Sequence, residues 1–206
     1  MSNNVEPKVL GNLPKGMIFV LSAPSGTGKT TLLKMLLKEF SCLEQSISYT
    51  TREPRAGEQE EKDYFFISKK KFLELKEKGA FLESAEVFDE YYGTSKSYVE
   101  ERINQGKHVL LVIDTQGAMQ LKKKLEAVFI FLAPPSMEEL QKRLSSRGAE
   151  TKDAQSKRLK KAEEELVCAK EYKYYVVNEE LSVTYDILRA IFIAEEHSTQ
   201  KQLNQG

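Results

Sequence analysis

The chain has 206 residues, of which 40% are hydrophobic, so it is long enough to bury one sizeable core. Its 31 Lys and Arg residues balance 31 Asp and Glu residues. A chain without net charge has no overall field that would draw it to nucleic acid or to an acidic membrane surface, so any anion site has to be local.

Cysteine and histidine content narrows the functional class further. Cys42 and Cys168 are far apart in the sequence and lack metal-ligand spacing, which predicts reduced thiols in a reducing, cytoplasmic compartment. No secretory signal is recognisable, and the longest apolar runs fall well below the roughly 20 residues of a membrane span. His108 and His197 are too few for a histidine zinc site or a Ser/His/Asp triad.

The first predicted unit is a strand, a loop and a helix. Residues 1–15 are polar and without period, so we expect a flexible N-terminal extension, with the fold starting near Gly16. The apolar run Met17–Leu21 predicts a strand, and a Gly- and Ser-rich loop follows it. Leucines at helical spacing then predict a helix that runs to Phe40.

Three later units repeat this alternation. The predicted pairs are a strand at His108–Ile113 with a helix at Ala118–Leu125, a strand at Val128–Leu132 with a helix from Ser136 to Leu144, and a strand at Tyr174–Val177 with a helix at Val183–Glu196. Fully apolar strands that alternate with helices indicate an α/β fold, in which a parallel sheet is flanked by helices.

Two insertions divide the predicted core into the segments 16–45, 106–144 and 171–196. Residues 46–105 contain a charged loop and strand-favouring stretches at Tyr64–Ile67 and Phe81–Tyr92, which predict a small mixed subdomain. Residues 145–170 carry many charges and few apolar residues, a pattern typical of a solvated helical face and equally of a lid over a nucleotide. Residues 197–206 are expected to form a C-terminal tail.

A phosphate-loop motif joins the first strand to the first helix. The sequence from Ala23 to Thr30 is Ala-Pro-Ser-Gly-Thr-Gly-Lys-Thr, which fits G-x-x-x-x-G-K-[ST] except that Ala23 replaces the first glycine. Glycines let backbone N–H groups converge on phosphate oxygens, Lys29 can reach the transferring phosphate, and Thr30 can offer a hydroxyl to magnesium. The loop indicates a nucleotide site, but GTPases, motor ATPases and kinases all share it.

Asp114 directly follows the apolar run that ends at Ile113. P-loop proteins place their second acidic group at this end of a neighbouring strand. An aspartate after a strand is also a common helix cap, so both roles remain open.

Four motifs in the segment 46–105 help to separate these classes. They are Ser48–Glu58, Asp63–Phe66, Phe81–Glu83 and Tyr91–Thr94, and together they resemble the GMP-binding region of guanylate kinases. The resemblance runs in order from about Met17 to Ala194 and includes the Ala23 variant of the phosphate loop. The further matching motifs are Ile113–Gly117, Ala133–Ser136, Lys142–Leu144, Arg147–Gly148, Lys157–Leu159 and Val177–Asn178.

The resemblance implies a P-loop core, a GMP-binding subdomain and a helical lid. It implies the reaction ATP + GMP giving ADP + GDP, with Mg²⁺, in purine nucleotide metabolism and GTP and dGTP supply, and with dGMP also accepted. The catalytic residues that it implies are Lys29, Arg52, Arg143, Arg147 and Arg158. The implied ATP-binding residues are Ala23, Pro24, Ser25, Gly26, Thr27, Gly28, Lys29, Thr30, Thr31 and Asn178. The implied GMP-binding residues are Ser48, Arg52, Arg55, Tyr64, Glu83, Tyr92, Gly93, Thr94 and Asp114, and magnesium is expected at Thr30.

The chemistry of these side chains suits the roles that the resemblance implies. Arg52 and Arg55 can hold a doubly charged phosphate with planar, paired donors that lysine cannot duplicate. Tyr64 and Tyr92 can add phenolic donors. Glu83 can accept hydrogen bonds from the guanine base.

The sequence departs from the family at one position and leaves two rivals. The family pattern before Asp114 is Asp-x-Asp, whereas Val112 occupies the first acidic position, so one carboxylate of a pair on the same strand face is lost. A relative that phosphorylates a ribose bisphosphate would not need the carboxylate of Glu83. A guanylate-kinase-like scaffold module that binds protein partners would not need an intact Gly28-Lys29-Thr30.

Overall fold

The computed structural model describes residues 8–145 and 152–199. Its core is a five-stranded sheet in the order β2-β7-β1-β8-β9, and every neighbouring pair is parallel. The strands are β1 (Ile18–Ser22), β2 (Leu43–Gln45), β7 (His108–Val112), β8 (Val128–Ala133) and β9 (Tyr174–Val177). The predicted parallel sheet is therefore confirmed, and the short edge strand β2 is an addition to it.

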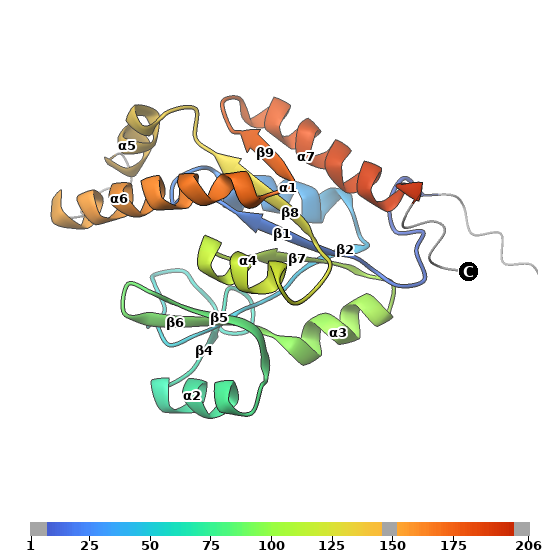
Figure 1. The fold of residues 1–206 in the computed structure, drawn as a ribbon, viewed down its shortest axis with the longest axis horizontal. Helices are drawn as coiled ribbons and strands as arrows, with labels where there is room; N and C mark the ends of the chain where they lie inside the picture. Colours follow the sequence, from blue (N-terminus) through green and yellow to red (C-terminus); the bar gives the residue numbers. More distant parts are fainter. Residues whose placement is uncertain (1–7, 146–151, 200–206) are drawn as a thin grey trace, which may run out of the picture.

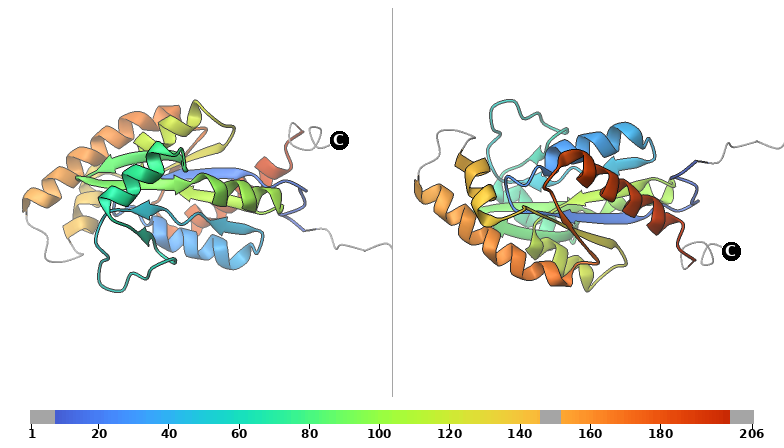
Figure 2. Two further views of the ribbon diagram at one scale, coloured as in Figure 1. Left: turned by 90° about the horizontal axis from the view of Figure 1, so that it is seen from below. Right: turned by 90° about the horizontal axis from the view of Figure 1, so that it is seen from above.

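Helices cover both faces of this sheet, as Figures 1 and 2 show. Side chains alternate across β1, so Phe19 and Leu21 pack on the face of α1 (Lys29–Glu39) and α7 (Leu181–Glu196). Val20 lies on the opposite face, in a second cluster with residues of α3 (Lys96–Asn104) and α4 (Thr115–Lys122). Burial on both faces explains why β1 and β7 read as continuous apolar runs.

The first insertion forms a second sheet in the order β4-β3-β6-β5. Its elements are β3 (Tyr49–Thr50), β4 (Phe65–Phe66), α2 (Lys69–Glu77), β5 (Phe81–Val87) and β6 (Glu90–Ser95). β3 pairs with β4 in parallel and with β6 antiparallel, so the sheet is mixed. Phe72 of α2 is fully buried and stacks on Phe81, with ring centroids 4.7 Å apart. The subdomain, which Figure 1 shows below the main sheet, therefore has a small aromatic core of its own.

The second insertion is helical. α5 (Met137–Ser145) and α6 (Lys152–Cys168) pack through Leu140, Leu144 and Ala162, and the turn η1 (Ala169–Glu171) leads from α6 to β9. Ser136 Oγ accepts from the backbone N–H of Glu139 at the start of α5, as the sequence predicts. α6 lies on the same side of the core sheet as α4 (Figure 2). No helix within residues 8–145 and 152–199 is long and apolar enough to cross a membrane.

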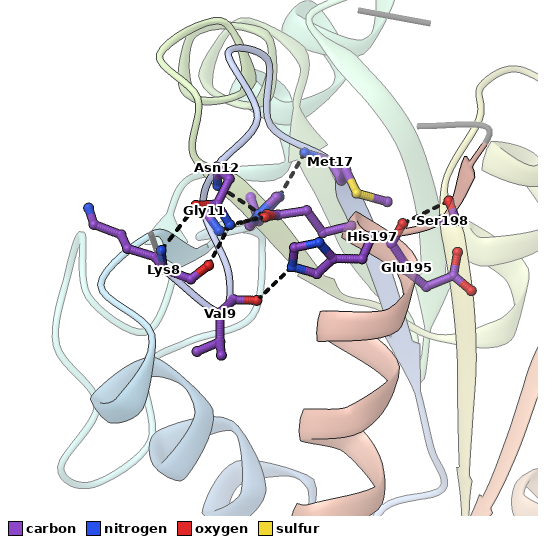
Figure 3. Close-up of polar contacts among 10 residues, drawn as sticks. Lys8, Val9, Gly11, Asn12, Met17, Glu195, His197 and Ser198 are labelled. Carbon is purple, nitrogen blue, oxygen red and sulfur yellow. Dashed lines mark hydrogen bonds and ion pairs between the residues drawn. The ribbon is translucent and has the colours of Figure 1, made fainter. Parts of the chain in front are cut away.

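The prediction of a flexible extension over residues 1–15 is wrong for residues 8–15. Leu10 and Leu13 are buried in the same cluster as α1 and α7. The carboxylate of Glu196, at the end of α7, accepts hydrogen bonds from the backbone N–H groups of Gly11 and Asn12. Figure 3 labels Gly11 and Asn12 among the polar contacts of this segment. The segment is fixed by a residue from the far end of the chain, which no local periodicity can reveal. Residues 1–7, and residues 200–206 of the expected tail, lie outside the described part.

His108 connects the same carboxylate to the core sheet. Its Nδ1 accepts from the backbone N–H of Met17 at 3.0 Å, so the proton of the neutral ring is on Nε2. Nε2 donates to Glu196 Oε2 at 2.6 Å, and both side chains are fully buried. His108 therefore has a structural role.

Candidate functional site

A cavity of about 380 Å³ lies where the core, the subdomain of residues 46–105 and α6 meet. Most of the predicted site residues line it together, although they come from distant parts of the sequence. They are Ala23, Pro24, Ser25, Gly26, Thr27, Gly28, Lys29, Thr30 and Thr31 from the phosphate loop and α1, Ser48, Arg55, Tyr64, Glu83 and Tyr92 from the subdomain, and Asp114 and Arg158. The structure thus places the phosphate loop and the subdomain of residues 46–105 around one space.

The phosphate loop is held in shape by contacts behind it. Gly26 and Gly28 have φ angles of 90° and 93°, a backbone conformation that favours glycine. The Asn178 side-chain amide donates to the carbonyl of Thr27 at 2.6 Å, and a Cβ at Gly28 would lie 2.5 Å from the same amide nitrogen. Asn178 therefore braces the loop, and only a glycine at position 28 leaves room for it.

Lys29 begins α1 and lies against the loop that precedes it. Its Nζ donates to the carbonyl of Ala23 at 3.1 Å. Burial lowers the pKa of Lys29, while the carboxylates of Glu165 and Asp114 act in the opposite direction. The ammonium is thus placed beside the loop, at the N-terminal end of a helix where anions are favoured.

Glu83 provides a buried carboxyl group in the wall of the cavity that the subdomain of residues 46–105 forms. It is 4% exposed, and its Oε1 accepts from the Thr94 hydroxyl at 2.6 Å. Burial raises the pKa of Glu83 to about 7, although the Thr94 hydrogen bond opposes this. A Cβ at Gly117 would lie 2.4 Å from Glu83 Oε2, so this glycine gives the carboxyl group its room. Gly93 does not line the cavity; it backs onto Phe81.

The two predicted phosphate arginines are placed differently. Arg55 lines the cavity, together with Tyr64 and Tyr92. The Arg52 guanidinium donates to both carboxylate oxygens of Glu58 at 2.9 Å, lies 5.4 Å from the Tyr64 ring centroid and is not among the lining residues. Both bonds to Glu58 come from Nη2, and Nη1 donates to the carbonyl of Glu53 at 2.7 Å, so both terminal nitrogens of Arg52 already have acceptors within its own loop.

Of the three arginines expected to converge on the triphosphate, the structure describes Arg143 and Arg158, and only Arg158 is at the cavity. Arg143 contacts Glu139 at 3.3 Å and the carbonyl of Asn178 at 3.4 Å, and it is not among the residues that line the cavity. Arg147 lies outside the described residues.

Asp114 performs the capping role that the sequence left open, and it also faces the cavity. Its Oδ1 accepts from the backbone N–H of Gly117 at the start of α4, at 3.0 Å. Its Oδ2 is 3.4 Å from the Nζ of Lys161. Val112, two residues earlier, lines the same cavity with an apolar side chain. The helix cap therefore fixes the carboxylate of Asp114, which is the acidic residue of the Asp-x-Asp pattern that this chain retains.

Sequence reasoning missed several residues of the cavity wall, among them Phe88, Lys161 and Glu165. Glu165 is 7% exposed, and burial raises its pKa to about 7. Lys161 and Glu165 follow Arg158 at three and seven residues, which places all three on one side of a helix. This spacing was available in the sequence, but it does not show which side of α6 faces the nucleotide.

Comparisons with known proteins agree on one family. A family model described as guanylate kinase matches residues 15–195. The guanylate kinase of Protochlamydia amoebophila is 49% identical over 94% of this chain and 98% of that protein. The guanylate kinase of Caldanaerobacter subterraneus is 47% identical over 88% of this chain and 89% of that protein. The crystal structure of guanylate kinase from Anaplasma phagocytophilum has a TM-score of 0.75 at 36% identity, covering 93% of this chain and 91% of the other.

Proposed function

The chain belongs to the guanylate kinase family, and we propose that its residues 46–105 form an acceptor subdomain that binds GMP. We propose that ATP phosphorylates GMP in the cavity between this acceptor subdomain and the phosphate loop. The chain is a kinase, and its reaction is ATP + GMP giving ADP + GDP. One observation carries the assignment of the site: a phosphate loop and a buried carboxylate, Glu83, line the same cavity.

Glu83 is proposed to read the guanine base. When ionised it can accept from guanine N1–H and from the exocyclic N2 amine at the same time, whereas adenine offers neither of these donors. The Thr94 hydroxyl fixes Oε1 from behind, so the carboxylate is oriented before the base arrives. A site built around such hydrogen bonds can discriminate by roughly 10⁴-fold or more.

The acceptor phosphate is proposed to bind Arg55, Arg52, Tyr64 and Tyr92. Arg55 and both tyrosines already line the cavity. For Arg52 to join them with its planar pair of donors, the phosphate has to share or replace the contacts of Nη2 with Glu58 and of Nη1 with the carbonyl of Glu53. Ser48 and Asp114 complete the proposed acceptor site, with Gly93 and Thr94 behind it.

Lys29 is proposed to stabilise the charge that develops on the transferring phosphoryl group. The attacking GMP phosphate is already an oxyanion, so the reaction needs no strong general base, and positioning and charge stabilisation suffice. Arg158 reaches the same cavity from α6, and Arg143 and Arg147 are proposed to join it when the lid closes. Closure would exclude water, whose attack would waste ATP by hydrolysis.

Magnesium is proposed to bind with ATP, next to Thr30. The residues fit this role only in part, because Thr30 and Asp114 reach the cavity while apolar Val112 stands where the family has a second carboxylate. When bound, such an ion would offset the negative charge of the phosphate groups. We therefore propose that this chain relies on ATP, water and Thr30 to hold the metal.

We also propose that dGMP is accepted, since the recognition groups named above address the base and the phosphate rather than the sugar. A cytoplasmic role in GTP and dGTP supply is proposed with it, in line with two free cysteines, Cys42 and Cys168. The test is ADP release with GMP, dGMP, IMP and AMP as acceptors. GMP and dGMP should support turnover, IMP should be intermediate, and AMP as effective as GMP would contradict the guanine assignment.

A further inference from the structure

Lys161 connects three separate parts of the chain. It belongs to α6, and its Nζ is 3.4 Å from Oδ2 of Asp114, which follows β7 of the core. The same Nζ lies 5.2 Å from the ring centroid of Phe88, at the tip of the β5–β6 hairpin of the acceptor subdomain. The ammonium group of Lys161 thus links α6, the lid helix, to the core through Asp114 and to the β5–β6 hairpin, the acceptor hairpin, through Phe88.

The environment of this ammonium group distinguishes it from an ordinary surface charge. The side chains of Lys161 and Asp114 are 22% and 16% exposed, so their ion pair is partly shielded from water. Exposed ion pairs contribute little to stability, but shielding strengthens an electrostatic contact. Asp114 is fixed from its other oxygen by the cap on α4, so Lys161 meets a carboxylate that cannot follow it if α6 moves away.

Phe88 is held in a strained backbone conformation. The hairpin turn has only Phe88 and Asp89 between the paired residues Val87 and Glu90, and their φ angles are 53° and 66°. Such turns favour Asn-Gly, and a bulky residue at positive φ is a genuine outlier. Phe88 nevertheless lines the cavity and remains 55% exposed. Strain of this kind tends to persist at functional sites.

We propose that Lys161 and Phe88 form a latch between the lid helix and the acceptor hairpin, so that binding of GMP favours the closed position of α6. Both are positioning residues, since the geometry described gives neither a role at the reacting atoms. An aromatic face attracts an ammonium, so the contact needs a cation at 161 and a ring at 88. The inference rests on the proposed function, because GMP is the ligand proposed to bind beside this hairpin.

The first variant is Lys161→Met, which keeps the length of the side chain and removes its charge. We expect kcat/KM for GMP to fall by about tenfold to a hundredfold, since small misplacements of catalytic groups have effects of this size. Affinity for a non-hydrolysable ATP analogue measured without GMP should be unchanged. Lys161→Arg should restore most of the activity, because it keeps the charge and the attraction to the ring. Lys160→Met, an exposed lysine on the same helix, is the matched control and should behave as wild type.

The second variant is Phe88→Asn, which suits a positive φ and removes the ring. A latch predicts that thermal stability is equal to or above that of wild type while kcat/KM for GMP falls. A merely structural Phe88 predicts lower stability. The double variant Lys161→Met/Phe88→Asn should lose no more than the more affected single variant, because both changes break one contact.

Two outcomes would overturn the latch: Lys161→Met kinetics indistinguishable from Lys160→Met, or effects of the two substitutions that multiply as if independent. Failure of the proposed function is a different result. It would appear as a wild-type protein that releases no ADP with GMP, and the latch would then fall with it.

Discussion

Glu83 combines burial, a fixed orientation and a titration range close to neutral pH. Burial raises the pKa of Glu83 to about 7. At neutral pH, Glu83 is therefore protonated in a substantial fraction of the free protein molecules. Only the ionised form can accept from two donors of guanine. Binding of GMP is therefore coupled to loss of a proton from this group.

The first prediction is a pH dependence of GMP binding. As the pH falls below about 7, the ionised fraction of Glu83 falls up to tenfold per pH unit, so KM for GMP should rise by the same factor. Glu83→Gln replaces an acceptor oxygen with a donor amide, so it should weaken GMP use steeply and abolish this pH dependence. Steady-state kinetics between pH 5.5 and 8.5, with ATP saturating, provide the measurement. A profile that survives in Glu83→Gln would assign the titration to another group, such as Glu165.

Lys29 gives a prediction about catalysis without a change in fold. The Nζ of Lys29 donates a hydrogen bond to the carbonyl of Ala23, and burial disfavours the charged form of the side chain. Lys29→Met should therefore leave thermal melting almost unchanged. Loss of the ammonium should lower kcat by about 10³-fold, the size of effect seen when one preorganised charge-stabilising donor is removed. Lys34→Met, an exposed lysine on the same helix, is the control. Near wild-type turnover with unchanged melting would contradict the phosphate-loop assignment.

Arg55 and Arg52 should affect the acceptor and leave the donor alone. Arg55→Lys and Arg52→Lys keep the charge but lose the planar pair of donors, so KM for GMP should rise about 10- to 100-fold, as expected for the loss of one charge-assisted hydrogen bond. Arg189→Lys, whose partner Glu39 lies away from the cavity, is the control. Titrations with GMP and with a non-hydrolysable ATP analogue distinguish the roles. Equal weakening of both ligands would argue against an acceptor site.

At the scale of elements, burial decides what the sequence could predict. β1, β7 and β8 are apolar because they lie inside the parallel sheet, whereas β9 is an edge strand in which Tyr175 and Val177 are exposed. All four were predicted within one residue of their observed ends. β2 has three residues, of which only Leu43 is buried, so its pattern is too short to recognise. The segment from Leu10 to Asn12 was missed because its order depends on Glu196, a contact across nearly the whole chain.

Glu196 therefore carries a stability prediction. Burial opposes its ionisation, but hydrogen bonds from His108, Gly11 and Asn12 outweigh this and lower its pKa to about 2, below the usual 4.5. A lowered pKa means that the ionised form stabilises the fold above about pH 4.5 and that this contribution is lost as the pH falls towards 2. At about 1.4 kcal/mol per pKa unit, the contribution is on the order of 3 kcal/mol.

Glu196→Gln should consequently lower the free energy of unfolding by a similar amount at pH 7 and flatten its decline between pH 4.5 and 2. GMP kinetics should be unaffected at temperatures where the variant is folded, because the contact is far from the cavity lining. Glu179→Gln, an exposed residue, is the control. Chemical denaturation at several pH values measures the effect, and a variant as stable as Glu179→Gln would show that the carboxylate does not hold the N-terminal segment.

At the scale of the whole molecule, the site is an assembly of segments rather than a motif. The phosphate loop could be found because its residues are contiguous, and the acceptor residues because they resemble a family. The approach of Lys161 to Asp114 could not be found, because it depends on how α6 crosses the end of the core. The position of Asn178 is a similar case: the sequence assigned it to ATP, while its amide supports the loop from behind.

A cavity walled by three parts of the chain predicts that its two substrates stabilise the protein together. A ligand at 100 times its Kd adds about 2.7 kcal/mol, and for a domain of this size each kcal/mol raises Tm by about 2–4 °C. GMP and a non-hydrolysable ATP analogue, each at that excess, should together raise Tm by more than the sum of their separate shifts, since the first ligand orders walls that the second also uses. Glu83→Gln should lose the shift caused by GMP and the synergy while keeping the shift caused by the analogue. Thermal melting with each ligand alone and with both provides the measurement, and strictly additive shifts in the wild type would mean that the donor and acceptor sites are independent.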